Sequence, residues 1–143
     1  MPHLVILYSG NLDARTDMSA LCRSLADTML AQRDEAGQPV FPPGGTRVLA
    51  YPAAHFAISD GGAAGRAAGG DGNYGFVWLN LRMGRGRSEA VQQFIGQSLS
   101  ATAKAHFQPL MATMHLGVTL QIDEGLEVFD AKNSSLHPLF KKT

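Results

Sequence analysis

The sequence predicts an α+β domain made of two β-α-β units in tandem. Apolar segments with strand and helix periodicity follow one another in the order strand, helix, strand, and this order occurs twice with a glycine-rich stretch between. Each crossover should be right-handed and should therefore give a pair of parallel strands. The 143 residues suit one domain that spans the whole chain, residues 1–143.

The first unit runs from the N-terminus to about residue 52. Residues 4–8 form a continuous apolar run, which is typical of a strand covered on both faces. A helix is predicted over 16–35, because apolar residues recur there at helical spacing: Met18, Leu21, Cys22, Leu25 and Met29. Prolines and glycines then mark a loop, and residues 46–51 form a short strand that ends at Pro52.

A Gly/Ala-rich segment at 55–73 separates the two units. Its composition is typical of a flexible surface insertion, and it is too short to link two domains. Residues 74–83 then form the clearest strand. Phe76, Trp78, Asn80 and Arg82 share one face of it, and Val77, Leu79, Leu81 and Met83 share the other.

The second unit continues with a glycine turn, a long helix and a last strand. Ser88 is placed to cap the helix, whose predicted apolar stripe comprises Val91, Phe94, Ile95, Leu99, Phe107, Leu110 and Met111. The last strand carries alternating apolar residues at Leu116, Val118, Leu120 and Ile122. The tail at 125–143 is predicted to be an arm that packs on a neighbouring subunit, because it mixes apolar residues with turn residues.

Composition excludes several classes of function. With 12 basic and 12 acidic residues there is no electrostatic case for nucleic acid, and no apolar run is long enough to span a bilayer. The single cysteine, Cys22, favours a reducing cytoplasm and a place in the helix core. No cluster has metal-ligand spacing. Phosphate binding at 84–88 is a weak alternative, because the segment lacks the lysine of a P-loop.

The N-terminal sequence Met1-Pro2-His3 carries the candidate catalytic group. Removal of Met1 leaves Pro2 with a free secondary amine fixed at the start of a buried strand. Nearby cations, or exclusion of water, lower the pKa of such an amine and make the neutral base available near pH 7. The sequence therefore indicates that Pro2 is a general base.

Several segments together resemble the 5-carboxymethyl-2-hydroxymuconate isomerase family of the tautomerase superfamily. They are Met1-Pro2-His3, Phe41-Pro42, Thr46-Arg47-Val48, Tyr74-Gly75-Phe76-Val77, the run from Leu81 to Ser88, Ala105-His106-Phe107, and the late Asn133 with His137-Pro138-Leu139-Phe140. The resemblance covers most of the chain apart from the insertion. It implies a four-stranded mixed sheet with two helices on one face, assembled as a homotrimer with active sites near subunit boundaries.

The resemblance also implies a cofactor-free proton shift on a small anionic substrate, an unsaturated dicarboxylate from homoprotocatechuate breakdown. Pro2 takes a proton from one carbon and returns it to another. Arg87 matches the family's arginine at the glycine loop and is assigned to carboxylate binding. Arg47 and His3 are assigned to the substrate site as supporting residues. Arg82 and Arg85 are interpreted as solvated.

One departure from the family pattern concerns the second strand. The family has two arginines there, separated by one residue, and Gly45 stands in place of the earlier one. Arg66 in the insertion is one candidate to replace it. The departure motivates an alternative, a tautomerase of a different and less charged enol acid. A second alternative is a trimeric binding protein without catalysis.

Overall fold

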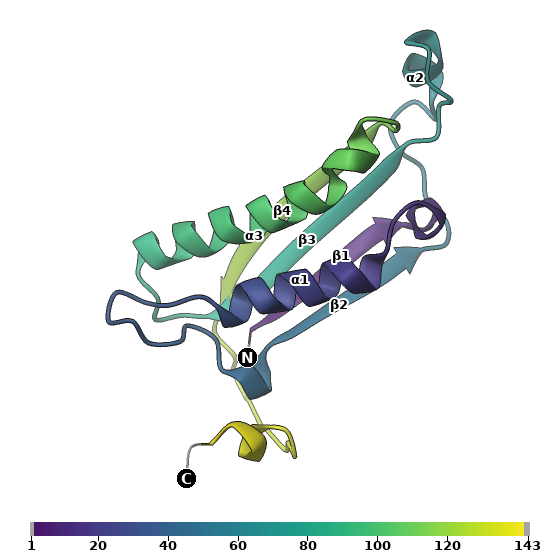
Figure 1. Cartoon of the computed structure of the whole chain (residues 1–143). Coiled ribbons are helices and arrows are strands. Elements are labelled where there is room, and N and C mark those ends of the chain that lie inside the picture. Colours follow the sequence, from purple (N-terminus) through teal and green to yellow (C-terminus); the bar gives the residue numbers. More distant parts are fainter. Residues whose placement is uncertain (1, 142–143) are drawn as a thin grey trace.

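The computed structural model describes residues 2–141, which form a four-stranded mixed sheet with three α-helices (Figure 1). The elements in chain order are β1 (His3–Ser9), η1 (Gly10–Ala14), α1 (Met18–Leu30), η2 (Pro43–Gly45), β2 (Arg47–Ala53), α2 (Ala63–Ala67), β3 (Gly75–Gly84), α3 (Glu89–Met111), β4 (Leu116–Gly125) and η3 (His137–Phe140). The strand order is β2-β1-β3-β4. β1 and β2 are parallel, as are β3 and β4, while β1 and β3 pair antiparallel. The two predicted β-α-β units are therefore confirmed.

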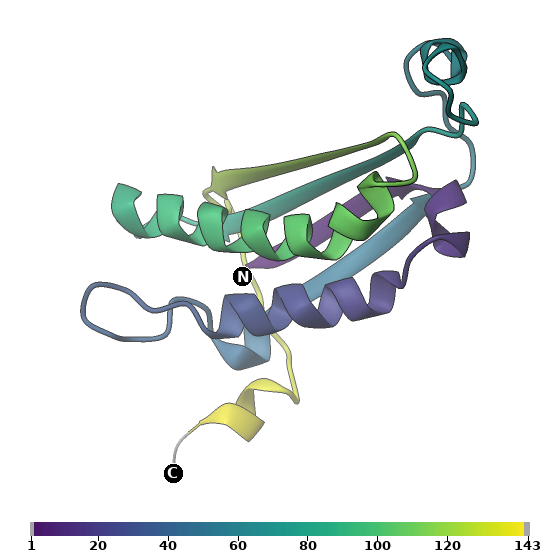
Figure 2. The ribbon, with the colours of Figure 1, turned by 45° about the horizontal axis from the view of Figure 1, so that its top comes forward.

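Helices α1 and α3 lie side by side on one face of the sheet, as both ribbon views show (Figures 1 and 2). The core between sheet and helices comes from alternate strand positions and from one stripe of each helix. Its fully buried strand residues are Leu4, Ile6, Val77, Leu79 and Leu81, which face Leu21, Leu25, Met29, Ile95, Leu99 and Phe107 of the helices. The opposite face, which we call the open face, carries no helix of the described chain.

Side-chain caps begin both long helices. The Asp17 carboxylate accepts a hydrogen bond from the Ala20 amide, and the Ser88 hydroxyl oxygen accepts one from the Val91 amide. Each cap satisfies one of the amides left free in a first helical turn. The predicted cap at Ser88 is confirmed.

The structure corrects three details of the sequence prediction. Helix α1 is shorter than the predicted 16–35, because Asp17 caps its start and Ala31 is its C-terminal cap. β2 continues through Pro52, which an edge strand tolerates. In α3 the predicted apolar stripe is too wide, since Phe94 is 59% and Met111 is 43% exposed.

The insertion contains more ordered structure than its composition predicts. Asp60 accepts hydrogen bonds from the amides of Gly62 and Ala64 and so begins α2. Backbone hydrogen bonding lowers the pKa of the Asp60 carboxyl group. The Tyr74 hydroxyl oxygen accepts a hydrogen bond from the Gly65 amide, 2.8 Å away. A short hydrogen-bonded helix therefore replaces the expected plain loop.

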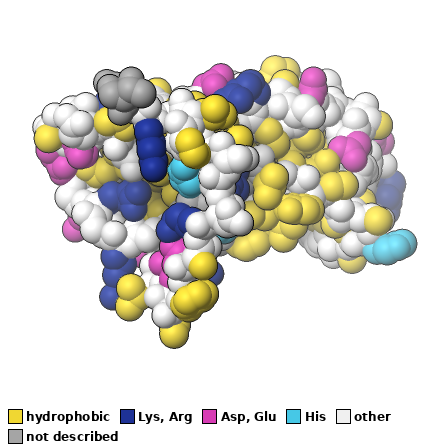
Figure 3. All heavy atoms as spheres, turned by 90° about the horizontal axis from the view of Figure 1, so that it is seen from below, with side chains coloured by type: hydrophobic (Ala, Val, Ile, Leu, Met, Phe, Trp, Pro, Cys, Tyr) yellow, Lys and Arg dark blue, Asp and Glu magenta, His cyan; other side chains and the backbone are white. Residues whose placement is uncertain are grey.

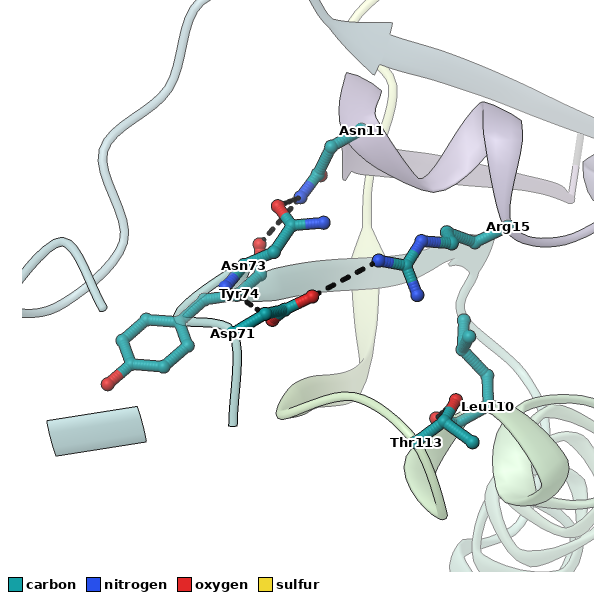
Figure 4. Close-up of polar contacts among 7 residues, drawn as sticks. All are labelled: Asn11, Arg15, Asp71, Asn73, Tyr74, Leu110 and Thr113. Atoms are coloured by element: carbon teal, nitrogen blue, oxygen red, sulfur yellow. Dashed lines mark hydrogen bonds and ion pairs between the residues drawn. The ribbon is translucent and has the colours of Figure 1, made fainter. Parts of the chain in front are cut away.

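Polar contacts tie the end of the insertion to η1 (Figure 4). The Asn11 amide nitrogen donates to the side-chain oxygen of Asn73 at 2.9 Å and to the carbonyl oxygen of Tyr74 at 2.7 Å. Arg15 lies 3.5 Å from Asp71. These contacts fix where the chain enters β3, at the end of the sheet far from the N-terminus.

The C-terminal arm leaves β4 and passes beneath the start of β1 (Figure 1). It packs on η2 of the same chain, where Gly44 is essential: a Cβ there would lie 2.7 Å from Nδ1 of His137. Between residues 2 and 141, every helix is too short or too polar to cross a membrane.

Candidate active site

Three basic side chains lie in one row across the sheet. In the strand register His3 is the partner of Arg47 on β2 and of Arg82 on β3. Partner residues point to the same face of a sheet, and alternation along β1 places His3 opposite the buried Leu4. All three side chains therefore lie on the open face, at the end of the sheet where the chain begins.

The C-terminal arm closes this row into a hollow of about 680 Å³, which we call the arm hollow. Its walls comprise His3, Arg47 and Arg82 from the strands and Glu127, Asp130, Ala131, Lys132, Asn133, Ser134, Ser135 and Leu136 from the arm. Seen from below, Lys and Arg side chains gather on the side where the arm projects (Figure 3). Three cations face two carboxylates there, with histidine as a further titratable group.

The cations of the arm hollow differ in what they contact. Lys132 pairs with Asp130, and this contact lowers the pKa of the Asp130 carboxyl group. The side chains of Arg47 and Arg82 form no ion pair or hydrogen bond with any residue of the described chain, 2–141. Asp123, the register partner of Arg82 on β4, instead accepts a hydrogen bond from Asn80 at 2.9 Å. Two guanidinium groups are thus available for an anion.

Pro2 immediately precedes β1 and is buried. Alternation along the strand places its ring on the helix-covered side, with Leu4, while His3 next to it lines the arm hollow. The nitrogen of Pro2 therefore lies at the end of the strand, one residue from the wall of the hollow. In the chain as translated that nitrogen is an amide to Met1, so basicity requires that Met1 be removed.

Arg87 lies in a different environment from Arg47 and Arg82. Its Nη1 donates to the carbonyl oxygen of Gly84 at 2.9 Å and its Nη2 to that of Val40 at 3.1 Å. The guanidinium carbon lies 5.4 Å from the centre of the Phe41 ring, which is a cation–π contact. Its buried Nε has no partner among residues 2–141. Arg87 joins the glycine turn after β3 to the segment that precedes η2.

Gly45, which stands where the family pattern has an arginine, and Arg66, the candidate to replace that arginine, lie far apart within one chain. Gly45 is buried in η2, the turn that carries the arm contact. Arg66 belongs to α2, at the end of the molecule opposite the N-terminus (Figure 1), and its Nη1 lies 3.5 Å from the carbonyl oxygen of Gly61. Within one chain, Arg66 is therefore too distant to act beside Pro2.

A larger hollow, about 910 Å³, lies between β2 and the start of α1. Its wall includes Tyr8, whose hydroxyl donates to Asp13 at 2.6 Å. Burial, together with Asp13, raises the pKa of Tyr8 to about 12, so Tyr8 stays protonated. This hollow holds Arg15, already in contact with Asp71, and Cys22, whose thiol pKa is raised by burial. This hollow is therefore a weaker candidate for the active site than the arm hollow, because its arginine is already paired and its tyrosine stays protonated.

Residues 2–141 hold no group of three or more His, Cys, Asp or Glu side chains arranged to bind a metal ion. The arm hollow is rich in guanidinium and ammonium donors, which suit anions rather than cations. Its chemistry is that of an anion site next to an N-terminal residue.

The structure places Pro2, His3 and Arg47, three of the residues that the sequence assigned to the site, at one end of the sheet, and it places Arg82 and Lys132 there as well. Arg82 was interpreted as solvated, and it is exposed in the structure, where it also lines the arm hollow. The available signal was its place on the same strand face as Trp78 and Asn80, away from the core. The pairing that sets it opposite His3 joins residues 79 positions apart, which periodicity along one strand cannot show.

The fold is an α+β domain with two β-α-β units in one mixed sheet and a proline before the first strand. The comparisons with known proteins specify it further. Residues 2–140 match the family model described as 5-carboxymethyl-2-hydroxymuconate isomerase. The chain belongs to this family, and it is an isomerase.

Individual relatives agree with this assignment. The 5-carboxymethyl-2-hydroxymuconate Delta-isomerase of Escherichia coli is 27% identical over 141 residues, which cover 99% of this chain and 100% of that protein. A solved 5-carboxymethyl-2-hydroxymuconate delta-isomerase is 62% identical, with a TM-score of 0.96, and the match covers 100% of this chain and 95% of that one. The corresponding isomerase from Deinococcus radiodurans R1 is 30% identical, with a TM-score of 0.78 and coverage of 99% and 95%.

More distant structures share the fold alone. A protein described as an F6 fused 4-OT wild type asymmetric trimer is 16% identical, with a TM-score of 0.54, and covers 97% of this chain and 99% of its own. At this identity the likeness supports the tandem β-α-β architecture and nothing finer.

Proposed function

We propose that this chain isomerises 5-carboxymethyl-2-hydroxymuconate, with Pro2 as the general base after Met1 is removed. One observation carries the proposal: Pro2 opens the buried strand β1, and its neighbour His3 lines a hollow with two arginines that have no other partner in the described chain. The relatives' names supply the substrate.

The proposed chemistry needs a base that is neutral near pH 7. A free α-amino group has a pKa of about 8, and nearby cations lower it because they disfavour the protonated form. Arg47 and Arg82 supply positive charge in the arm hollow, one residue along β1 from Pro2. The neutral Pro2 amine takes the proton from the 2-hydroxyl group of the substrate, which leaves a dienolate. The prolinium then gives a proton to carbon 5, which forms the 2-oxo-3-ene isomer and restores the neutral amine. The product is an isomer, so no oxidant or cofactor is consumed.

The proposed roles of the cations follow from the substrate's charge. Muconate is a dicarboxylate, and the carboxymethyl group adds a third carboxylate. Arginine binds a carboxylate through both oxygens, which suits Arg47 in the arm hollow, with His3 beside it as a hydrogen-bonding group. We assign Arg87 to the charge that develops as the dienolate forms. Its bonds to two carbonyl groups hold that charge in place.

We also propose that the active unit is a homotrimer in which the C-terminal arm packs on a neighbouring copy. The support is exposed apolar surface: Leu126 is 74%, Phe129 is 85% and Leu139 is 72% exposed on the arm. Leu7, Leu49, Tyr51 and Phe76 are at least 40% exposed on the open face. Exposed apolar surface of this extent on a single chain is typical of a protein interaction surface.

We place the proposed reaction in the breakdown of homoprotocatechuate, in a reducing cytoplasm.

A second candidate keeps the base and changes the substrate. Gly45 is buried in the turn that supports the arm and supplies no charge where the family pattern has an arginine. A less charged enol acid fits a site with one cation fewer. The two candidates differ in which substrate has the higher kcat/KM, the muconate with three carboxylates or a simple 2-hydroxydienoate.

The test is Pro2→Ala in a chain whose mass shows that Met1 is absent. The expected result is a fall in kcat of about 10²- to 10⁴-fold, the range of general acid–base catalysis, with an unchanged thermal unfolding temperature. Arg66→Ala is the control, because it removes a charge at the far end of the fold. An undiminished rate in Pro2→Ala would exclude Pro2 as the base. A fully processed wild-type chain that turns over no enol acid would favour a trimeric binding protein without catalysis.

A further inference from the structure

We infer that Arg82 binds the carboxymethyl carboxylate of the substrate and supplies the positive charge that Gly45 does not. This inference rests on the proposed function and identifies a specificity-determining residue of that site. Family resemblance leaves Arg82 without a role, and the argument for it comes from its position.

The strand register places Arg82 and Arg47 on either side of the same residue. Arg82 on β3 and Arg47 on β2 both pair with His3 on the strand between them. Neighbouring strands lie about 4.8 Å apart, so the two arginines begin about 10 Å apart on one face. A substrate whose carboxylates are separated by a carbon chain can contact both at once.

The second step is that Arg82 is uncommitted. Lys132, the third cation on the wall of the arm hollow, is already paired with Asp130. Asp123 is next to Arg82 in the sheet but accepts its hydrogen bond from Asn80. Among residues 2–141, no carboxylate lies within ion-pair distance of the Arg82 guanidinium group.

The third step is that β4 leaves room for the Arg82 guanidinium. The group lies over Gly125, the last residue of β4, and a Cβ there would lie 2.9 Å from its Nη2. The missing Cβ of Gly125 therefore leaves space for the guanidinium group of Arg82, a residue that lines the arm hollow. Two arginines without counter-ions on one face repel each other, and a bound carboxylate relieves that repulsion.

The inference is tested by steady-state kinetics with two substrates, 5-carboxymethyl-2-hydroxymuconate and 2-hydroxymuconate, which lacks the carboxymethyl group. Arg82→Ala should raise KM for the first by about 10- to 100-fold, as expected when a charged hydrogen bond is lost. It should change KM for the second less than about threefold, because that substrate has no carboxylate for Arg82. Arg82→Lys should recover part of the loss, since the charge returns without the planar fork that binds both carboxylate oxygens.

Two further variants complete the test. Gly125→Ala keeps Arg82 but displaces its guanidinium, and it should raise KM in the same selective way. Arg66→Ala is the matched control and should leave both KM values unchanged. An unchanged KM for the larger substrate in Arg82→Ala, or an equal rise for both substrates, would overturn the inference. If the wild-type chain acts on neither substrate, the proposed function fails instead.

Discussion

At the start of β1, the adjacent residues Pro2 and His3 face opposite sides of the sheet. Pro2 is buried on the helix-covered side, and His3 lines the arm hollow on the open face. The arginines assigned to the site differ in their contacts. The guanidinium groups of Arg47 and Arg82 have no partner among residues 2–141, whereas that of Arg87 donates hydrogen bonds to the carbonyl oxygens of Gly84 and Val40. The residue type alone does not show which arginine is hydrogen-bonded, because that depends on the residues that pack around it in the fold.

Arg87→Ala should lower the free energy of unfolding by about 2 kcal/mol, because it removes two hydrogen bonds from a charged donor and the contact with Phe41. Arg87→Lys should lower it as well, because an ammonium group lacks the planar fork that reaches both carbonyl groups. Urea unfolding measures both. Arg85→Ala is the control, since Arg85 is exposed in the same turn. Equal stability of all three variants would show that these contacts contribute nothing to folding.

At the scale of the elements, α3 is joined to the start of α1 by a side-chain contact. Nε2 of His106 lies 2.8 Å from the hydroxyl of Thr16, and its ring packs edge-on against Phe107. Burial lowers the pKa of His106, although Asp17 nearby acts in the opposite direction. The neutral imidazole is therefore the form that the folded chain prefers.

The lowered pKa of His106 predicts a loss of stability in mild acid. The unfolded chain takes up a proton near the ordinary pKa of about 6.5, whereas the folded chain resists until a lower pH. Stability from this group is thus complete above that value and falls as pH drops through the lowered folded value. Urea unfolding from pH 7.5 to 5 should show a steeper fall for the wild type than for His106→Gln. Parallel curves would contradict this assignment.

The strands were predictable from sequence where burial on one face imposes a period, and the Ser88 cap was predictable from its residue type before a helical pattern. The alternation of β3 and the Ser88 cap are examples. Three features were not predictable, because they depend on contacts between distant segments. Arg82 gains its place through pairing with His3, Arg87 meets Val40 only in the folded chain, and the insertion is held by Asn11.

At the scale of the whole molecule, the single chain leaves much apolar surface uncovered. The arm projects from the sheet with Val128 and Phe129 exposed, and it also forms one wall of the arm hollow. Because the same arm exposes apolar residues for the proposed trimer and forms a wall of the arm hollow, we expect trimer formation to affect the shape of the hollow. Assembly and substrate affinity should therefore change together when its apolar residues are altered.

Phe129→Ser should weaken the trimer, because it removes an apolar side chain that is 85% exposed on the single chain and that we expect to be buried between copies. Light scattering over a dilution series should show dissociation at a higher concentration than for the wild type. Phe94→Ser is the matched control: Phe94 is 59% exposed on α3, the helix that covers the other face. Identical dissociation of the two variants would contradict a role for the arm.

The central claim is that a free Pro2 amine is the base, and blocking that amine tests it most directly. The measurement is kcat/KM for 5-carboxymethyl-2-hydroxymuconate, for the chain that begins at Pro2 and for the same chain with an uncleaved Gly-Ser before Pro2. Intact mass establishes each N-terminus. The account predicts that the processed chain is active and that the extended chain loses at least about 10²-fold, since an amide nitrogen is not a base. Equal activity of the two chains would contradict it.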